Sequence, residues 1–408
     1  MALRTLQQLG SRLSQTTTYN ERVLYGEVAF QAIIASGAVA FVNVFLVRLG
    51  AADWLVGLFT SLPALAIIVT ALPAGTFVQR QANLVATANG ARTIYRATIG
   101  LFALLPLLPS PWAAYVLVAA YTLISIPGSV SNLSITTILG MATSIERRPR
   151  MLSTRLAING LVAAIVGFLA GQWLDATSFP WNYQVLFVVG ALSGGLSIYM
   201  LSRLRLPPRS AADSQPHAPL KLRQMFDAIR AVPLFRNYCV AAFVFRIGLS
   251  LPSALYAVYR VRNVGASDAW IGLLLTVENL LSVFTYLALS RLLSRPFVRR
   301  WLWLSCPAIV LYPLTLAMAT TPPLLLLPSL SSGLFGAAMT VFITNTLFQV
   351  SPEDERPAFV AADVLLANVA AFLARTLGTV LAGLIGFSAA LLVIAAIRLF
   401  GGLSFWFL

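Results

Sequence analysis

Six ionisable residues lie inside the long apolar runs of this 408-residue sequence. An ionised side chain at the centre of a bilayer costs roughly 2.5–3.5 kcal/mol or more, so each one needs a partner or a role. Desolvation favours the neutral form of a carboxyl group, which suits a residue that carries protons. An arginine can hold an anionic group by paired hydrogen bonds. The six residues are the acids Glu27, Glu278 and Asp363 and the bases Arg246, Arg375 and Arg398.

The composition indicates that membrane-spanning elements position these residues. Hydrophobic residues make up 59% of the chain and charged residues only 10%, whereas soluble globular proteins carry about 25% charged residues. This excludes an ordinary cytosolic enzyme, a disordered protein and a nucleic-acid-binding domain. The net charge of +15 does not indicate a nucleic-acid partner, because the basic residues lie in short breaks between apolar runs.

Twelve apolar runs are long enough to cross a bilayer, which predicts an all-α membrane protein with twelve transmembrane helices. The longest polar break separates six runs from the other six. We therefore expect a cytoplasmic N-terminus at 1–22, a six-helix bundle at 23–203, a central cytoplasmic loop at 204–235 and a second bundle at 236–408. The runs are 23–48, 54–78, 92–109, 112–142, 152–174, 182–203, 236–259, 267–290, 301–319, 322–350, 357–384 and 387–408.

Basic residues mark one face of this predicted membrane protein. Of the 28 Lys and Arg residues, 22 fall at the N-terminus or in every second break between runs, against 3 in the other breaks. Arg92, Arg96 and Arg155 are counted among these loop residues. The positive-inside rule then places both termini in the cytoplasm, and we expect a bacterial inner (plasma) membrane.

Enzymatic and metal-binding chemistry finds little support. The chain has one histidine, His217, and two cysteines, Cys239 and Cys306, which fall in different predicted helices. A conventional zinc site would lack ligands, and a serine or cysteine nucleophile would lack a base. No GxxxxGK[ST] loop for ATP is present. We therefore expect no metal, no cofactor and no enzymatic activity.

A ten-residue motif occurs twice, each time between the first and second runs of its half. Residues 49–58 read LGAADWLVGL, and residues 264–273 read VGASDAWIGL. The repetition predicts a duplicated six-helix unit. The shared residues are Gly50, Ala51, Asp53, Gly57 and Leu58 in the first copy and Gly265, Ala266, Asp268, Gly272 and Leu273 in the second.

With two same-orientation repeats, a long central loop and the G-x-x-D entry into the second span of each half, the chain resembles the major facilitator superfamily. The family's acidic loop motif after span two is not kept, because Gln79 stands near the place of its aspartate. The resemblance implies two pseudo-symmetric bundles that rock about a central site. It further implies gradient-driven transport of a small solute by a monomer surrounded by membrane lipids. The alternative is a non-transporting sensor or assembly subunit with a transporter fold.

The buried acids are the expected proton-coupling residues. Glu278 lies midway along its run and is either a proton carrier or the ion-pair partner of Arg246. Glu27 has Gln31 one helical turn further on the same face, and it either takes part in transport or lies at a wetted inner rim. Asp363 is expected to close a cytoplasmic gate against basic loop residues.

The resemblance also implies that spans one, four, seven and ten line a central cavity. Arg246 and Arg375 are therefore expected to bind substrate, and Arg398, on an outer helix, is expected to be structural. Buried paired charges are compatible with an anionic, zwitterionic or amphiphilic solute. Four uncharged residues are further substrate-binding candidates, and each is otherwise an interhelical hydrogen-bonding group worth about 1 kcal/mol or less: Gln31, Tyr121, Asn132 and Asn345.

Overall fold

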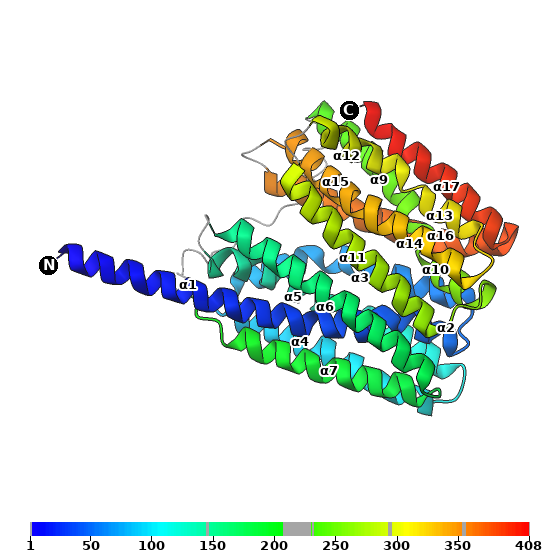
Figure 1. The fold of residues 1–408 in the computed structure, drawn as a ribbon, viewed down its shortest axis with the longest axis horizontal. Coiled ribbons are helices and arrows are strands. Elements are labelled where there is room, and N and C mark those ends of the chain that lie inside the picture. Colours follow the sequence, from blue (N-terminus) through cyan, green and yellow to red (C-terminus); the bar gives the residue numbers. More distant parts are fainter. Residues whose placement is uncertain are drawn as a thin grey trace.

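The computed structural model describes residues 2–143, 147–206, 230, 232–292, 296–352 and 356–407. Within these ranges every regular element is a helix, which confirms the predicted all-α membrane fold. Figure 1 shows the helices as two groups lying side by side. His217 and most of the predicted central loop lie outside the described residues.

The first half of the chain forms six helical spans. The first of them is interrupted by one π and one 3-10 segment beside Gly37, at a point where the regular hydrogen-bond ladder changes. The elements are α1 (Ala2–Ile33), η1 (Ile34–Ala38), η2 (Val39–Phe41), α2 (Val42–Arg48), α3 (Asp53–Arg80), α4 (Leu84–Leu101), η3 (Phe102–Leu107), α5 (Trp112–Ala142), α6 (Arg148–Ala176) and α7 (Trp181–Ser202).

The second half repeats this arrangement with more interruptions. Pro252 separates α9 from α10, because proline cannot donate the backbone hydrogen bond that would continue the helix. The elements are α9 (Pro233–Ser250), α10 (Ser253–Val258), η4 (Tyr259–Asn263), α11 (Asp268–Leu292), α12 (Pro296–Ala308), α13 (Leu311–Ala317), η5 (Pro322–Leu325), α14 (Leu326–Ser331), η6 (Ser332–Gly336), α15 (Ala337–Val350), α16 (Arg356–Ile385), α17 (Phe387–Ser404) and η7 (Phe405–Phe407).

Among the described residues, ten helical segments are long and apolar enough to cross a membrane. Two more helical segments complete six spans in each half: α4 with η3 in the first half, and α12 with α13 in the second. The predicted start of the third span at residue 92 was wrong, because α4 begins at Leu84, after Asn83 caps its N-terminus by accepting a 3.0 Å hydrogen bond from the backbone of Ala86. Arg92 and Arg96 therefore lie within a helix rather than in a loop.

The helix ends form two opposite ends of the molecule. We call the end with both chain termini, Arg203 and Pro233 the terminal end, and the end with Arg48 and Arg262 the junction end. The terminal end lies on the left in Figure 1. α1 runs without a break through the predicted boundary after residue 22, and its first turns extend beyond the bundle at the terminal end.

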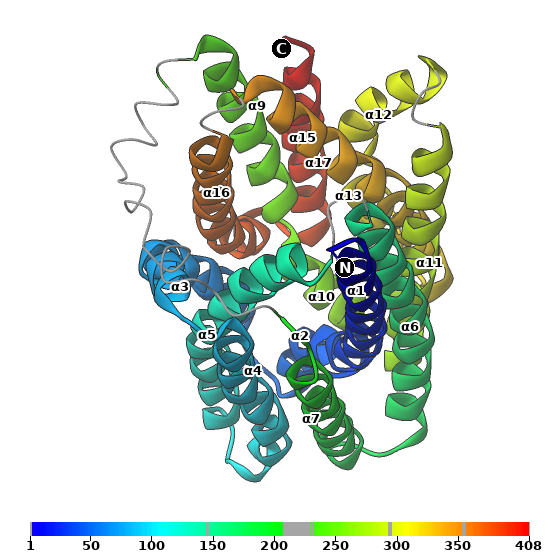
Figure 2. The same cartoon turned by 90° about the vertical axis from the view of Figure 1, so that its left-hand side faces the viewer.

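Two pairs of long helices join the halves along most of their length. In Figure 2, seen from the terminal end, α6 lies beside α11 on one side and α3 beside α16 on the other. Glycines allow the first pair to approach closely. A Cβ added at Gly171 would lie 2.7 Å from the carbonyl oxygen of Asp268 and 2.9 Å from the Cα of Gly272. Small residues are typical of such close helix contacts in membranes.

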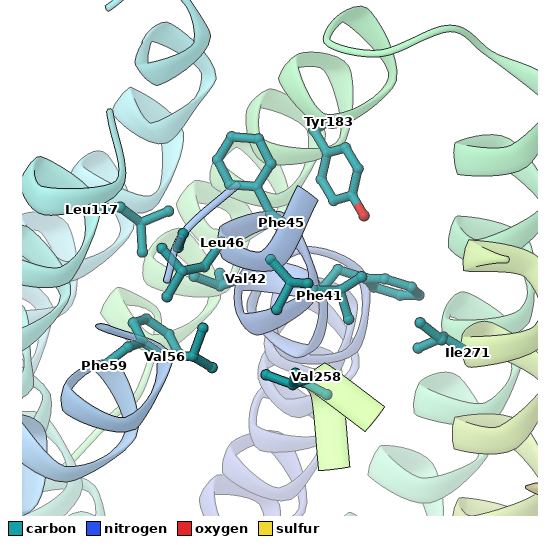
Figure 3. Packing of buried hydrophobic residues seen from close by; sticks show 14 of the residues in the cluster. Phe41, Val42, Phe45, Leu46, Val56, Phe59, Leu117, Tyr183, Val258 and Ile271 are labelled. Carbon is teal, nitrogen blue, oxygen red and sulfur yellow. The ribbon is translucent and has the colours of Figure 1, made fainter. Parts of the chain in front are cut away.

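A shared apolar core closes the junction end. Phe41 and Phe45 of the first span, both fully buried, belong to one cluster with Val258 of α10 and Ile271 of α11. Figure 3 shows Phe41 on the side of Val258 and Ile271 of the second half, with Phe45 beside Tyr183 of its own bundle. The two bundles are therefore packed against each other at the junction end through side chains that exclude water.

Candidate functional site

Glu27 of α1 lies at the centre of a polar network inside the first bundle, and it is fully buried. Arg92 of α4 donates to one carboxylate oxygen at 2.6 Å, and Arg155 of α6 donates to the other at 3.0 Å. Ser197 of α7 donates to the first oxygen at 3.2 Å. Arg92 also donates to the hydroxyl of Ser131 on α5 at 3.2 Å. The network around this one carboxylate thus ties together five helices of the bundle.

A second set of contacts lies one helical turn further from the terminal end. Arg96 donates through Nη2 to the side-chain oxygen of Gln31, and at 3.2 Å to the hydroxyl of Ser197. Through Nη1 it donates at 2.5 Å to the carbonyl oxygen of Gly194. A Cβ at Gly194 would lie 2.7 Å from the Arg96 side chain, so any larger residue at this position would displace that side chain.

The spacing of these residues in sequence could have revealed the network. Glu27 and Gln31 are four apart on one helix, and Arg92 and Arg96 are four apart on its neighbour. Residues at this spacing share a helix face, so two such pairs can meet side by side. Hydropathy alone counts both arginines, together with Arg155, as loop residues, because they lie near the start of their apolar runs.

The network carries more positive than negative charge. Glu27 is the one acid in contact with Arg92 and Arg155, and the Nη1 atom of Arg155 is buried with no partner among the described residues. The three acceptors of Arg96 are an amide oxygen, a backbone carbonyl and a hydroxyl, all of them neutral. Positive charge without a counter-charge is costly at this depth and attracts anions.

Two neighbouring cavities adjoin the network. The first, of about 190 Å³, is lined by Gln31, Arg92, Arg96, Tyr95 and Asn132 among others. The second, of about 370 Å³, shares Tyr95, Gly128 and Asn132 with the first and also has Tyr121 and Pro63 in its wall. The structure therefore brings together three residues expected from sequence to bind substrate, namely Gln31, Tyr121 and Asn132.

Arg375 reaches the same region from the other bundle. Its Nη1 atom donates at 2.6 Å to the backbone oxygen of Thr60 on α3, across the boundary between the halves. Its Nε atom is buried without a hydrogen-bond partner among the described residues. Tyr121, in the wall of the second cavity, is an electrostatic neighbour of this guanidinium. Arg375 thus places beside the cavities a further cation that has no acidic partner among the described residues.

Arg246 and Asp363 form a paired ion bridge inside the second bundle. The two guanidinium nitrogens lie 2.7 and 2.8 Å from the two carboxylate oxygens, and the hydroxyl of Tyr238 donates to the same carboxylate at 3.1 Å. The pairing of Arg246 with Glu278, which the sequence left open, is not formed. The reason is topological, because α9 packs on α16 and α17, whereas α11 packs on η6, α14 and α6.

The contacts of Asp363 also differ from those expected of a residue that closes a cytoplasmic gate. It is only 5% exposed, and its carboxylate is held by Arg246 and Tyr238 rather than by loop arginines among the described residues. Asn345 is exposed on α15 and is not among the residues that line the two cavities. The structure therefore leaves both residues apart from the polar region of the first bundle.

Glu278 has a different environment from the other two buried acids. The hydroxyl of Ser332, in η6, donates a hydrogen bond to its carboxylate. No arginine forms an ion pair with it among the described residues, in contrast to Glu27 and Asp363. Tyr256 and Tyr312 are electrostatic neighbours of this acid. An acid with a neutral partner can lose or gain a proton without leaving an arginine unpaired.

Arg398, expected to be structural, is buried and donates to four neutral acceptors. These are the backbone oxygens of Gly248, Leu249 and Ile309, at 3.2–3.3 Å, and the hydroxyl of Tyr256 at 3.1 Å. The side chain therefore joins α17 to α9, α10 and the segment before α13. Its contacts all lie within the second bundle.

At the junction end, each bundle extends an arginine to the other. Arg48 donates at 3.2 Å to the backbone oxygen of Ala266 and at 3.2 Å to Asp268. Arg262 donates at 2.5 Å to the backbone oxygen of Ala51 and forms an ion pair with Asp53. The sequence indicated the repeated motif, but it did not show that the arginines bind the opposite copy.

Metal and thiol chemistry adds no candidate site within the described ranges. No group of three or more His, Cys, Asp or Glu side chains there is arranged to hold a metal ion. Cys239 and Cys306 are free thiols, both buried in the core of the second bundle. They pack as small apolar residues.

Comparisons with known proteins agree with this architecture. The sequence profile described as Major Facilitator Superfamily matches residues 28–262 and 238–408. A search among curated proteins finds no match. Many solved structures are similar in fold, and all of those compared below are 12–13% identical to the chain, a level that shows the fold alone.

Three of these structures illustrate the likeness. The nucleoside transporter NupG has a TM-score of 0.71 at 13% identity, covering 95% of this chain and 99% of its own. A POT family transporter in complex with 5-aminolevulinic acid has a TM-score of 0.70 at 12% identity, with 95% of each chain covered. A bacterial homologue of the human lysosomal transporter Spinster, inward-facing and occupied, has a TM-score of 0.69 at 12% identity, with 96% of each chain covered. On its sequence profile and its fold, this chain belongs to the Major Facilitator Superfamily.

Proposed function

We propose that the protein is a secondary active transporter that moves a small organic solute by alternating access. Membership of this superfamily and its membrane-spanning helices support a transporter that is not an enzyme. The observation that carries the mechanism is the contact between the two bundles at the junction end. Reciprocal ion pairs and a shared apolar core join the bundles at the junction end, and two cavities, one of them lined by arginines, lie nearer the middle. Breaking the junction while closing the terminal end would expose those cavities to the other side of the membrane.

Glu278 is our candidate for proton coupling. Its known partner is a hydroxyl group, so protonation removes a buried negative charge without leaving a cation unpaired. Glu27 and Asp363 are both held by arginines, and protonation of either would break an ion pair. The contacts therefore favour Glu278 over the other two acids that the sequence suggested.

The distribution of basic residues supports a location and an orientation. We propose that the chain lies in a bacterial inner (plasma) membrane with the terminal end in the cytoplasm. Arg147, Arg150, Arg203 and Arg205 lie at or near this end, as the positive-inside rule requires of a cytoplasmic face. A monomer is the proposed functional unit.

Solute-dependent proton flux tests the proposed function. Proteoliposomes that contain a pH-sensitive dye are given a pH gradient and one of four solutes: uridine, 5-aminolevulinic acid, dialanine or 4-phenylbutyrate. We expect at least one solute to increase proton movement above the rate in empty vesicles. Glu278→Gln keeps the hydrogen bond with Ser332 but cannot release a proton, and it should abolish that increase.

Glu21→Gln is the matched control. Glu21 forms a 2.9 Å ion pair with Arg147 at the terminal end, away from the second bundle. Its replacement removes one carboxylate without affecting Glu278, so proton flux should stay near the level of the unchanged protein. Binding of a solute that stabilises the protein against heat without any flux would support the sensor alternative instead. Unchanged coupling in Glu278→Gln would refute the role of this acid.

A further inference from the structure

We propose that the two cavities of the first bundle form one binding site for an organic monoanion with an apolar body. This inference rests on the proposed function, since it names the solute class that the transporter would carry. The anionic group would lie against Arg92 and Arg96 in the first cavity. The apolar body would lie in the second cavity, beside Tyr95 and Tyr121. This cavity adjoins the first, because the two share wall residues.

Unneutralised positive charge is the first argument. Arg92 and Arg155 share a single carboxylate, that of Glu27, and the neighbouring Arg96 donates only to neutral acceptors. A cation buried at this depth without a counter-charge is costly, and a bound anion would relieve that cost. A neutral or cationic solute would leave the imbalance in place.

Unused donors are the second argument. Arg92 donates through Nε and Nη1, and Arg96 through Nη1 and Nη2. The Nη2 atom of Arg92 and the Nε atom of Arg96 donate to no atom of the described residues, and neither is among the fully buried unpartnered atoms. Both side chains line the first cavity, where Asn132 supplies a further amide donor. Such donors match the oxygens of a carboxylate.

The wall of the second cavity sets the shape of the solute. Tyr95 and Tyr121 contribute aromatic surface, and Pro63, Ile67 and Leu133 contribute aliphatic surface. Tyr121 is held in place by Phe59, whose ring centre lies 4.5 Å away. An apolar group, and an aromatic ring in particular, fits such a wall.

Arg375 connects the site to the second bundle. It donates to Thr60 of the first bundle, and its buried Nε atom has no partner among the described residues. Because its charge lies near Tyr121, an anion in the cavities would attract a cation that belongs to the opposite half.

A matched series of ligands tests the charge requirement on the unchanged protein. Calorimetric titration in detergent measures the dissociation constants of 4-phenylbutyrate, its neutral amide 4-phenylbutyramide and the amine 4-phenylbutylamine. The three ligands share an apolar body and differ in the charge of the terminal group, which is negative, neutral or positive. We expect the carboxylate to bind at least tenfold more tightly than the amide and the amine to bind most weakly.

Two variants test the location. Arg96→Gln should weaken 4-phenylbutyrate binding at least tenfold and leave amide binding unchanged. Gly128→Leu should abolish binding of both, because a Cβ at Gly128 meets nothing closer than 3.5 Å and the longer side chain would extend into both cavities. Gly140→Leu is the control on the same helix, since an added Cβ there meets no atom within 4 Å.

Distinct outcomes separate this inference from the proposed function. Equal affinities for carboxylate and amide, or full binding by Gly128→Leu, would overturn the site even if transport of another solute were observed. Binding of lysophosphatidylglycerol with no binding of 4-phenylbutyrate would assign the cavities to a lipid headgroup and also overturn it. Selective carboxylate binding without proton flux would support the site and refute the transporter. If Arg96→Gln fails to fold, the ligand series still tests the charge requirement and Gly128→Leu still tests the location of the site.

Discussion

Asp53 and Asp268 occupy the same position in the repeated motif, and each accepts an arginine from the opposite bundle. The reciprocity extends to the backbone, because Arg48 and Arg262 also donate to the carbonyl oxygens of Ala266 and Ala51, which are likewise equivalent in the repeat. One duplicated loop thus supplies both halves of a two-fold related contact. A conformation that opens the junction end must break both ion pairs.

The two aspartates of this contact are not equal in burial, which gives the first prediction. Asp268 has a side chain 7% exposed and also accepts from Tyr183 at 3.0 Å, whereas the Asp53 side chain is 39% exposed. Removing one partner of a buried ion pair costs more than removing an exposed one, about 3–5 against 0.2–1 kcal/mol. Asp268→Asn should therefore open the junction end more than Asp53→Asn does.

Labelling of a buried cysteine measures this opening. Val258 is fully buried in the junction core, so Val258→Cys, with Cys239 and Cys306 replaced by Ala, should react slowly with a membrane-impermeant maleimide. We expect Asp268→Asn to increase the labelling rate about a hundredfold or more, and Asp53→Asn about fivefold or less, by the energies just given. Equal rates in the two variants would show that the pairs act as equals.

The second prediction concerns the glycine of the second motif copy. A Cβ at Gly272 would lie 2.9 Å from the Cα of Gly171 on the opposite bundle. Gly272→Val should therefore separate α6 from α11 and increase labelling of the Val258→Cys reporter at least as much as Asp268→Asn does. Gly195→Val is the control, because an added Cβ at this exposed position of α7 meets no atom within 4 Å. A slow labelling rate in Gly272→Val would mean that the helices adjust without opening.

The sequence alone predicts the fold because its strongest signals are local. Apolar run length and the repeated loop are read directly from neighbouring residues, and the structure agrees in helix class and in the position of both motif copies. The same reliance on apolar runs explains one error. Arg92 and Arg96 interrupt the hydropathy in the middle of α4, which makes them resemble loop residues although they lie inside the bundle.

The partners of buried charges require knowledge of which helices are neighbours. The sequence offered Glu278 as the partner of Arg246 and loop arginines as the partners of Asp363, whereas the packing of α9 on α16 pairs Arg246 with Asp363. The polar residues Gln31 and Asn132 could each be recognised as candidates. That they lie in one cavity depends on how α1 and α5 face each other, which no local pattern contains.

A third prediction follows from the central position of Glu27. Glu27→Gln leaves Arg92 and Arg155 without their carboxylate in a fully buried place. We expect a loss of about 3–5 kcal/mol in stability, seen as a lower midpoint of thermal unfolding in detergent. Adding Arg155→Gln to this variant removes one unpaired cation and should restore part of the loss. If the double variant is less stable than Glu27→Gln, charge balance is not what Glu27 provides.

The fourth prediction tests whether Arg246 and Asp363 act as one structural unit. Asp363→Asn leaves a buried guanidinium without its counter-charge, and Arg246→Gln leaves a buried carboxylate supported only by the hydroxyl of Tyr238. Each change should cost about 3–5 kcal/mol. The double variant retains two neutral groups that can bond to each other, so it should be more stable than the sum of the single losses predicts.

A double-mutant cycle gives the size of this coupling. Unfolding of the four proteins is followed in detergent, and the difference between the double loss and the sum of single losses is the interaction energy. For two side chains bonded at 2.7 and 2.8 Å we expect a value of about 1–3 kcal/mol. Proton flux in Arg246→Gln/Asp363→Asn should still respond to solute, because Glu278 remains available. Loss of solute-dependent flux in a stable double variant would instead make this ion pair part of the transport cycle, with its carboxylate taking the role assigned to Glu278.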